Sequence, residues 1–132
     1  MPPTPTVGAF LIADQVFQQT SGKWCVIGVF NRIHAPLFPW LHHSLGLFVV
    51  LADAEGEYKA KIDFCDAKDN VLGRIEGAPF QVRNRRDPAE FGVQTNALPI
   101  SAPGRYFFRL YLNDEMIKDA AIDVLQTEAP HA

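Results

Sequence analysis

Apolar and polar side chains alternate in the stretch RYFFRLYL, residues 105–112. Successive side chains of an extended chain point to opposite faces, so this stretch would have two different sides. One side would carry Tyr106, Phe108, Leu110 and Leu112. The other would carry Arg105, Phe107, Arg109 and Tyr111. This pattern is typical of an antiparallel β-sheet that buries one face and leaves the other in water.

Similar short runs, rich in Val, Ile, Phe and Tyr and closed by Gly, Asn or Asp turns, recur along the chain, and helical periodicity is nearly absent. We expect strands at Ala9–Gln18, Trp24–Ile33, Leu45–Ala52, Tyr58–Asp66, Val71–Ile75, Phe80–Arg83, Gly92–Leu98, Arg105–Leu112 and Met116–Leu125. One helical turn is expected at Arg86–Gly92, where Asp87 would cap it and Pro88 would take its first position. The spacing predicts an all-β fold, an antiparallel two-sheet β-sandwich of immunoglobulin-like or Greek-key character.

Length and composition predict one domain over residues 1–132, with a flexible Pro-rich tail at 1–6 and a frayed tail at 127–132. Twelve basic residues against 15 acidic ones give a formal charge of −3, which disfavours nucleic acid as a partner. No apolar run approaches the roughly 20 residues of a membrane-spanning helix, so we expect no membrane partner. Only two cysteines are present, and if both are free they favour a reducing compartment, the cytoplasm.

Two of the expected strands, Trp24–Phe30 and Leu45–Ala52, are apolar on both faces. A two-layer sandwich covers only one face of each sheet, and the chain has no long amphipathic helix to cover the other. The second face must then be covered by a loop, by another copy of the chain or by a different partner. The alternative is a small closed barrel with an apolar exterior.

The loop PLFPWLHHS, residues 36–44, lies between these two apolar stretches. Pro36 and Pro39 lack backbone donors, so the loop is not a central strand, and we expect a rigid crossing. Its large apolar side chains either fold back over the apolar strand faces, which we favour, or project and meet another chain. The candidate interface residues are Leu37, Phe38, Trp40, Leu41 and Phe48.

Catalytic and metal-binding patterns are weak. The neighbours His42 and His43 point to different sides of the chain, and His34 would reach them only through tertiary folding, so no closed ligand set is visible. Cys25 lies in an apolar strand, and Cys65 is expected on a charged strand face as an ordinary surface thiol. We therefore predict no enzyme, no cofactor and no metal site.

The stretch ADQVFQQTSGKWCVIGVFNRIHAPLFP, residues 13–39, resembles the opening of a family of small uncharacterised bacterial proteins, a domain of unknown function. The matching positions are Asp14, Val16, Gly22, Lys23, Ile27, Gly28, Phe30 and Pro39. Many members of this family carry Cys where Ala13 stands here, so a role of that thiol does not transfer to this chain. The family also ends in a hairpin similar to PGRYFFRLYLNDEMI, Pro103–Ile117. The resemblance implies a β-sandwich and brings no catalytic residues. The same hairpin also looks immunoglobulin-like, with Tyr106 placed to make a corner hydrogen bond.

Together these patterns predict a non-catalytic binding or assembly module that self-associates through its apolar strand faces and the 36–44 loop. Its partners would be a second copy or another protein. One alternative is a carbohydrate- or lipid-binding sandwich with Trp40 as a stacking platform. A less favoured alternative is a metal-dependent hydrolase that uses His34, His42 or His43.

Overall fold

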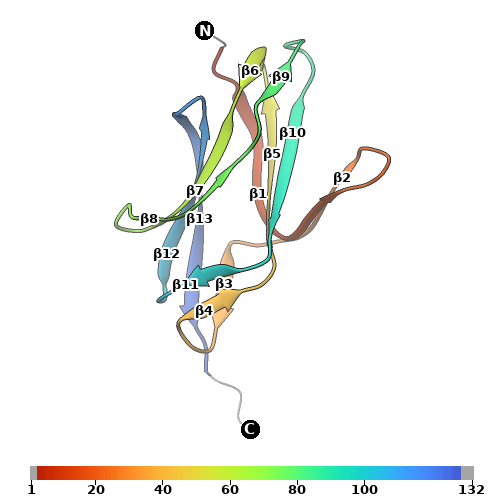
Figure 1. Cartoon of the computed structure of the whole chain (residues 1–132). Coiled ribbons are helices and arrows are strands. Elements are labelled where there is room, and N and C mark those ends of the chain that lie inside the picture. Colours follow the sequence, from red (N-terminus) through yellow and green to blue (C-terminus); the bar gives the residue numbers. More distant parts are fainter. Residues whose placement is uncertain (1–2, 129–132) are drawn as a thin grey trace.

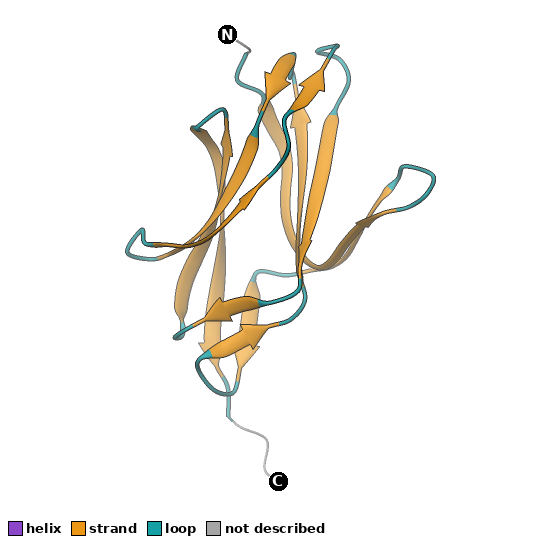
Figure 2. Cartoon of the chain, viewed as in Figure 1, coloured by secondary structure: helices purple, strands orange, loops and turns teal. Residues whose placement is uncertain are grey.

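The structure, a computed structural model, describes residues 3–128. In this part of the chain every regular element is a β-strand (Figures 1 and 2). Two main sheets face each other, and two small two-stranded sheets lie beside them. The prediction of an all-β, two-sheet sandwich is confirmed. No helix of residues 3–128 has the length and apolar composition that crossing a membrane requires.

The four-stranded sheet has the order β10-β5-β1-β2, and all its neighbours are antiparallel. Its strands are β1 (Thr6–Gln18), β2 (Trp24–Val29), β5 (Leu45–Ala52) and β10 (Ala89–Thr95). The five-stranded sheet has the order β3-β13-β12-β7-β8, in which only β3 and β13 pair in parallel. Its strands are β3 (Arg32–Ala35), β7 (Ala60–Asp66), β8 (Val71–Glu76), β12 (Gly104–Leu112) and β13 (Glu115–Gln126).

The small sheets pair β4 (Trp40–His42) with β11 (Leu98–Ile100), and β6 (Gly56–Tyr58) with β9 (Phe80–Val82). Both main sheets stay open, because β10 and β2 end one sheet and β3 and β8 end the other. The alternative of a small closed barrel is therefore wrong. The open edges of β8 and β10 become important for the candidate site below.

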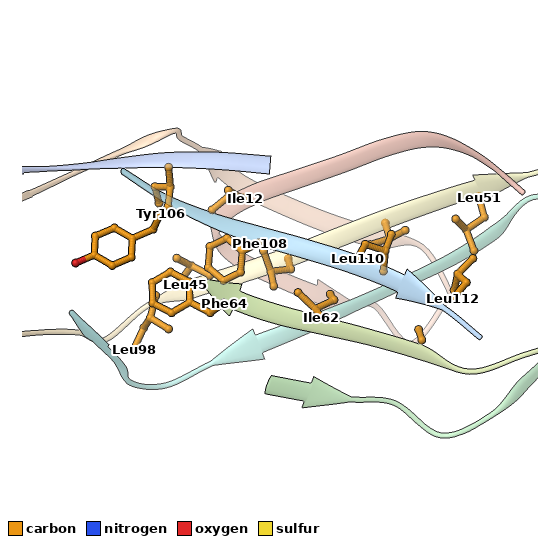
Figure 3. Close-up of a cluster of buried hydrophobic side chains, with 14 of the residues drawn as sticks. Ile12, Leu45, Leu51, Ile62, Phe64, Leu98, Tyr106, Phe108, Leu110 and Leu112 are labelled. Carbon is orange, nitrogen blue, oxygen red and sulfur yellow. The ribbon is translucent and has the colours of Figure 1, made fainter. Parts of the chain in front are cut away.

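The core lies between the two main sheets (Figure 3). The five-stranded sheet contributes the predicted inner row Tyr106, Phe108, Leu110 and Leu112, all buried. The four-stranded sheet contributes Leu45, Leu47, Val49 and Leu51, which are fully buried. The Tyr106 hydroxyl donates a hydrogen bond of 2.6 Å to the carbonyl oxygen of Ala102, so the predicted corner hydrogen bond is present.

The apolar outer face of β5 is covered by the chain itself. Strand β1 pairs with β5 up to Ala13 and with β2 beyond it, and the β1–β2 hairpin packs on the outer face of the sheet. There Phe48 is only 8% exposed, and its ring centroid lies 5.7 Å from that of Trp24. The outer face of β5 is thus covered by a segment of the same chain. This segment is the β1–β2 hairpin and not the 36–44 loop. In the C-terminal half of β2, Ile27 and Val29 stay 50% and 60% exposed.

Glycines make the close approach of this hairpin feasible. A Cβ at Gly92 would stand 2.6 Å from Val16 Cγ1, and one at Gly46 would stand 2.6 Å from Val16 Cγ2. The Gln94 side chain then bonds the hairpin backbone twice, accepting from the N–H of Val16 and donating to the carbonyl of Asp14. Because no side chain fills the space at either glycine, the second half of β1 can lie directly on the sheet.

Two expected elements are wrong. The expected strand Trp24–Ile33 is broken, because the chain changes sheets after Phe30. The N–H of Phe30 bonds Ile12 in one sheet, and the carbonyl of Asn31 accepts from Asp123 in the other. The helical turn expected at Arg86–Gly92 is absent, because the chain from Ala89 onward pairs with β5 as strand β10. In both places pairing with a distant strand overrides the local pattern.

At the N-terminus, residues 3–5 of the segment expected as a flexible tail lie against the domain. The Tyr58 hydroxyl donates to the carbonyl of Pro3 over 2.8 Å, and Pro5 is buried. Residues 1–2 and 129–132, which include His131, are outside the described part of the chain. Residues 127–128 follow the end of β13 at Gln126.

Candidate functional site

The five candidate interface residues do not form one surface. Leu37 and Leu41 are exposed, by 58% and 44%, whereas Phe38 and Trp40 are half-buried and pack against the main core. Phe48 lies elsewhere, in the small cluster beneath the β1–β2 hairpin. The structure therefore separates Phe48 from the loop residues. Their role as an interface stays a prediction.

His42 is held in place by packing and by a hydrogen bond from Trp40. It lies on β4, opposite Leu98 of β11, and its ring centroid is 6.0 Å from that of Phe30. Trp40 Nε1 donates to His42 Nδ1 over 3.4 Å, which requires a neutral imidazole as acceptor. Burial lowers the pKa of His42, although a backbone hydrogen bond at Ser44 and the charge of Asp14 oppose this effect. The side chain is therefore held in its neutral form.

This environment predicts a dependence of stability on pH. The pKa of His42 is lower in the folded chain than its ordinary value of 6.5, so protonation favours the unfolded chain. The contribution of neutral His42 is fully present above about 6.5 and is lost as the pH falls toward the folded pKa. We expect the urea midpoint to fall on mild acidification. His42→Gln should flatten this part of the profile, whereas His43→Gln should change it much less, because the charge of His43 is the smallest of the causes that shift the pKa of His42.

Within residues 3–128, no three His, Cys, Asp or Glu side chains are grouped so that they could hold a metal ion. His34 lies on β3, which pairs with β13, and is exposed. Cys25 and Cys65 are both free thiols. The expectation of a surface thiol at Cys65 is wrong, because the residue is fully buried and burial raises the pKa of its thiol. A protonated, enclosed thiol is a poor nucleophile.

A cleft with a volume of about 650 Å³ opens between the two main sheets. It is bordered by β8, the edge of the five-stranded sheet, by β9, and by β10, the edge of the four-stranded sheet. Figure 1 shows the chain running from β8 into β9 and turning back into β10, so that all three borders come from one continuous segment. These strands form the side on which the sandwich is open.

The floor of this cleft is an accessible part of the hydrophobic core. Ile62 and Val82 are buried, and five half-buried apolar residues pack against the core while they line the cleft. These five are Ile75, Phe80, Ala89, Phe91 and Val93. The ring centroids of Phe80 and Phe91 are 5.8 Å apart, in a tilted arrangement. The cleft therefore offers aromatic and aliphatic side chains to a ligand.

The rim of the cleft is acidic. Glu76, Asp87 and Glu90 line it, and all three are exposed. Arg83 is the one basic residue among the lining residues. The same loop also carries Arg85 and Arg86, which do not line the cleft. Three carboxylates against one guanidinium favour a ligand that combines apolar and cationic groups.

The outer face of the five-stranded sheet carries a second group of charges, in which three arginines are paired with aspartates. Arg74 forms two hydrogen bonds with the buried Asp63, of 2.7 and 3.2 Å. Arg105 pairs with Asp123 over 3.5 Å, and Arg109 pairs with Asp69. The guanidinium carbons of Arg105 and Arg109 lie 5.9 and 5.8 Å from the ring centroid of Phe107. This face interleaves basic and aromatic side chains, and three of its arginines are neutralised by aspartates, whereas Lys61 Nζ lies 4.5 Å from the ring centroid of Tyr111.

The cleft is not predicted from the sequence. The strands expected at Val71–Ile75 and Phe80–Arg83 are present as β8 and β9, but their sequences alone indicate no binding role. A usable signal was the short strand between two prolines, Pro79 and Pro88, because proline is typical of sheet edges. Edge strands with inward apolar residues are where a sandwich core becomes accessible.

The fold and the cleft define this chain as a small β-sandwich module with an apolar cleft at one open side. It belongs to the Family of unknown function (DUF6941), whose family model matches residues 8–125. The family membership predicted from residues 13–39 and the closing hairpin is thus confirmed. No curated protein matches the chain in sequence.

Among solved structures, the chain is similar to the Pseudomonas fluorescens alkylpurine DNA glycosylase AlkC bound to DNA containing an abasic site analog. The TM-score is 0.52 at 10% sequence identity, and the match covers 87% of this chain and 30% of the glycosylase chain. At this identity the likeness concerns the fold alone. The module spans less than a third of that enzyme.

One prediction about partners is corrected by this comparison. We predicted a second copy or another protein as partner and excluded nucleic acid because the net charge is −3. That exclusion is wrong, because a chain of similar fold occurs in a protein that is bound to DNA. Net charge averages over the whole surface, whereas contact with nucleic acid depends on one face.

Proposed function

We propose that this chain is a non-catalytic binding module that holds an elongated apolar ligand in the cleft between β8, β9 and β10. The observation that carries the proposal is the cleft itself, about 650 Å³ in volume and floored by half-buried core residues. Ligand sites in proteins are typically concave, mostly apolar and about 300–1,000 Å³ in volume, with a few polar groups at the edge. The free thiols and the family resemblance support a bacterial, cytoplasmic setting.

Self-association stays a prediction, and the apolar outer face of β5 gives it less support because the β1–β2 hairpin covers that face. Ile27 and Val29 of β2 stay exposed. A carbohydrate platform at Trp40 has less support, because this side chain is half-buried against the core. The cleft is where apolar surface remains open to a ligand.

Filling the cleft tests the proposal. Ala78 lines it from an exposed loop, so Ala78→Trp should occupy the space without removing a core side chain. We expect the neutral dye N-phenyl-1-naphthylamine to bind the wild-type protein and to bind this variant about tenfold more weakly, a difference of about 1.4 kcal/mol. The measurement is a fluorescence titration. Ala67→Trp, on an exposed loop that does not line the cleft, is the matched control and should bind as the wild type does. Equal dye affinity in all three proteins would exclude the cleft as the site.

Contact with DNA is a second candidate, favoured by the likeness to the DNA-bound glycosylase. The face that supports it carries Phe107 between Arg105 and Arg109, because nucleic-acid surfaces combine cations with aromatic rings. The test is the binding of duplex DNA containing an abasic site at increasing salt. Arg105→Gln with Arg109→Gln should abolish such binding, while Lys23→Gln with Arg85→Gln, an equal charge loss outside the five-stranded sheet, should weaken it less. Absence of any salt-dependent binding would remove this candidate.

A further inference from the structure

The residues that line the two long walls of the cleft show whether the strands meet it with a face of side chains or with a backbone edge. One wall consists of consecutive residues, Asp87 and Pro88 before β10 and Ala89 through Val93 on it, and the other consists of β9 with the following Arg83. Successive side chains of a strand point to opposite faces, so a wall made by one face would show only every second residue. Consecutive lining residues mean that the cleft meets both strands along their backbone edges.

These two edges are unpaired within the described chain, residues 3–128. Strand β10 pairs only with β5, and β9 pairs only with β6, although the two strands follow each other in sequence. An unpaired strand edge presents a row of backbone donors and acceptors, which readily pair with another extended chain. Pro88 removes one donor just before β10, so the usable edge begins at Ala89. An acyl chain would leave this backbone edge unpaired.

Resting on the binding role proposed above, we infer that the ligand is an extended peptide that adds as a strand along the free edge of β10, inside the cleft. In strand addition, main-chain hydrogen bonds give affinity and pockets for alternate side chains give specificity. One set of peptide side chains would enter the apolar floor at Ile75, Phe80 and Phe91. The other set would face the rim.

The rim specifies the second set of side chains. Glu76, Asp87 and Glu90 stand along it against Arg83 alone. Opposite charges across an interface attract, and like charges select against wrong partners. The peptide that fits this cleft therefore alternates apolar residues with Lys or Arg. The same acidic rim disfavours a phosphate backbone at this site.

The experiment uses a short acetylated peptide of alternating Val and Lys, with fluorescence displacement of N-phenyl-1-naphthylamine as the first readout. A peptide of alternating Val and Glu tests the charge, and the Val-Lys peptide with its alternate backbone amides N-methylated tests strand addition. We expect the Val-Lys peptide to displace the dye, and each of the other two to do so about tenfold more weakly. Hydrogen exchange should slow at the amides of residues 89–93 when the first peptide is bound.

Variants of the protein separate charge from fold. Glu90→Gln should weaken Val-Lys binding, and this weakening should shrink as salt rises. Glu57→Gln on β6 is exposed, does not line the cleft and should bind as the wild type does. Neither change removes an apolar side chain, so both proteins should fold normally.

The outcomes distinguish this inference from the proposed function. Dye binding that Ala78→Trp weakens, together with equal displacement by the plain and N-methylated peptides, would overturn strand addition and leave the binding role. Displacement by dodecylamine but by neither peptide would identify a lipid-like amphiphile and overturn the peptide. Displacement by oligothymidylate but by neither peptide would identify a nucleic acid as the ligand and would also overturn the peptide. Dye affinity unchanged by Ala78→Trp would overturn the binding role itself.

Discussion

Phe108→Ala should lower the free energy of unfolding by about 3–5 kcal/mol, the range measured for removing a buried Phe from a core. Phe108 is 1% exposed on the inner row of β12, and its ring centroid lies 5.0 Å from that of Phe64 on β7. Figure 3 shows both rings between the two sheets. The loss combines the lost burial of the ring with the cavity left behind, because strands on both sides hold the backbone in place.

Chemical denaturation measures this effect, and the next residue provides its control. Phe107 lies on the opposite face of the same strand and is half-buried between Arg105 and Arg109. Phe107→Ala should therefore lower the unfolding free energy by about 1 kcal/mol, because less apolar area returns to water. Equal losses for the two variants would contradict the assignment of faces on β12.

Arg74→Met should lower the free energy of unfolding clearly more than the loss of an exposed ion pair does, because it leaves the buried Asp63 carboxylate without its charged partner. The Asp63 side chain is only 4% exposed and receives two hydrogen bonds from the Arg74 guanidinium. The Arg74 side chain is 47% exposed, so water can partly replace it, and the loss should be smaller than for a fully buried pair.

A double variant tests the reason for this loss. Replacing both partners, Asp63→Val with Arg74→Met, removes the buried charge as well as its partner and should recover about half or more of the lost stability. The measurement is again chemical denaturation, arranged as a double-mutant cycle. Arg105→Met, which breaks the exposed pair with Asp123, should change stability by less than about 1 kcal/mol. Losses that simply add in the cycle would contradict a coupled buried pair.

Much of the fold could be predicted because alternation reports which face of a strand is buried. Leu45–Ala52 was predicted with its observed bounds, and the inner row of β12 and the Tyr106 corner bond were predicted residue by residue. These features depend on neighbours in sequence or on a short turn. Local chemistry is enough to specify them.

The rest depends on which distant strands pair, and local alternation does not encode this. The sheet change after Phe30 depends on Ile12 and Asp123, both far away in sequence. Cys65 lies opposite Phe107 on the expected charged face of β7 but is fully buried there, because alternation gives the face of a residue and not what covers that face. The cleft was missed for the same reason, because only the assembled sheets show that β9 and β10 lack a partner on one side.

The central claim is that the open side of the sandwich, between β9 and β10, is the place where this module binds. Chemical-shift mapping of isotope-labelled protein titrated with the Val-Lys peptide tests it most directly. The account predicts that the perturbed amides gather at residues 80–83 and 89–93. Perturbations centred on the 36–44 loop, or on the Arg105–Tyr111 face of β12, would contradict it.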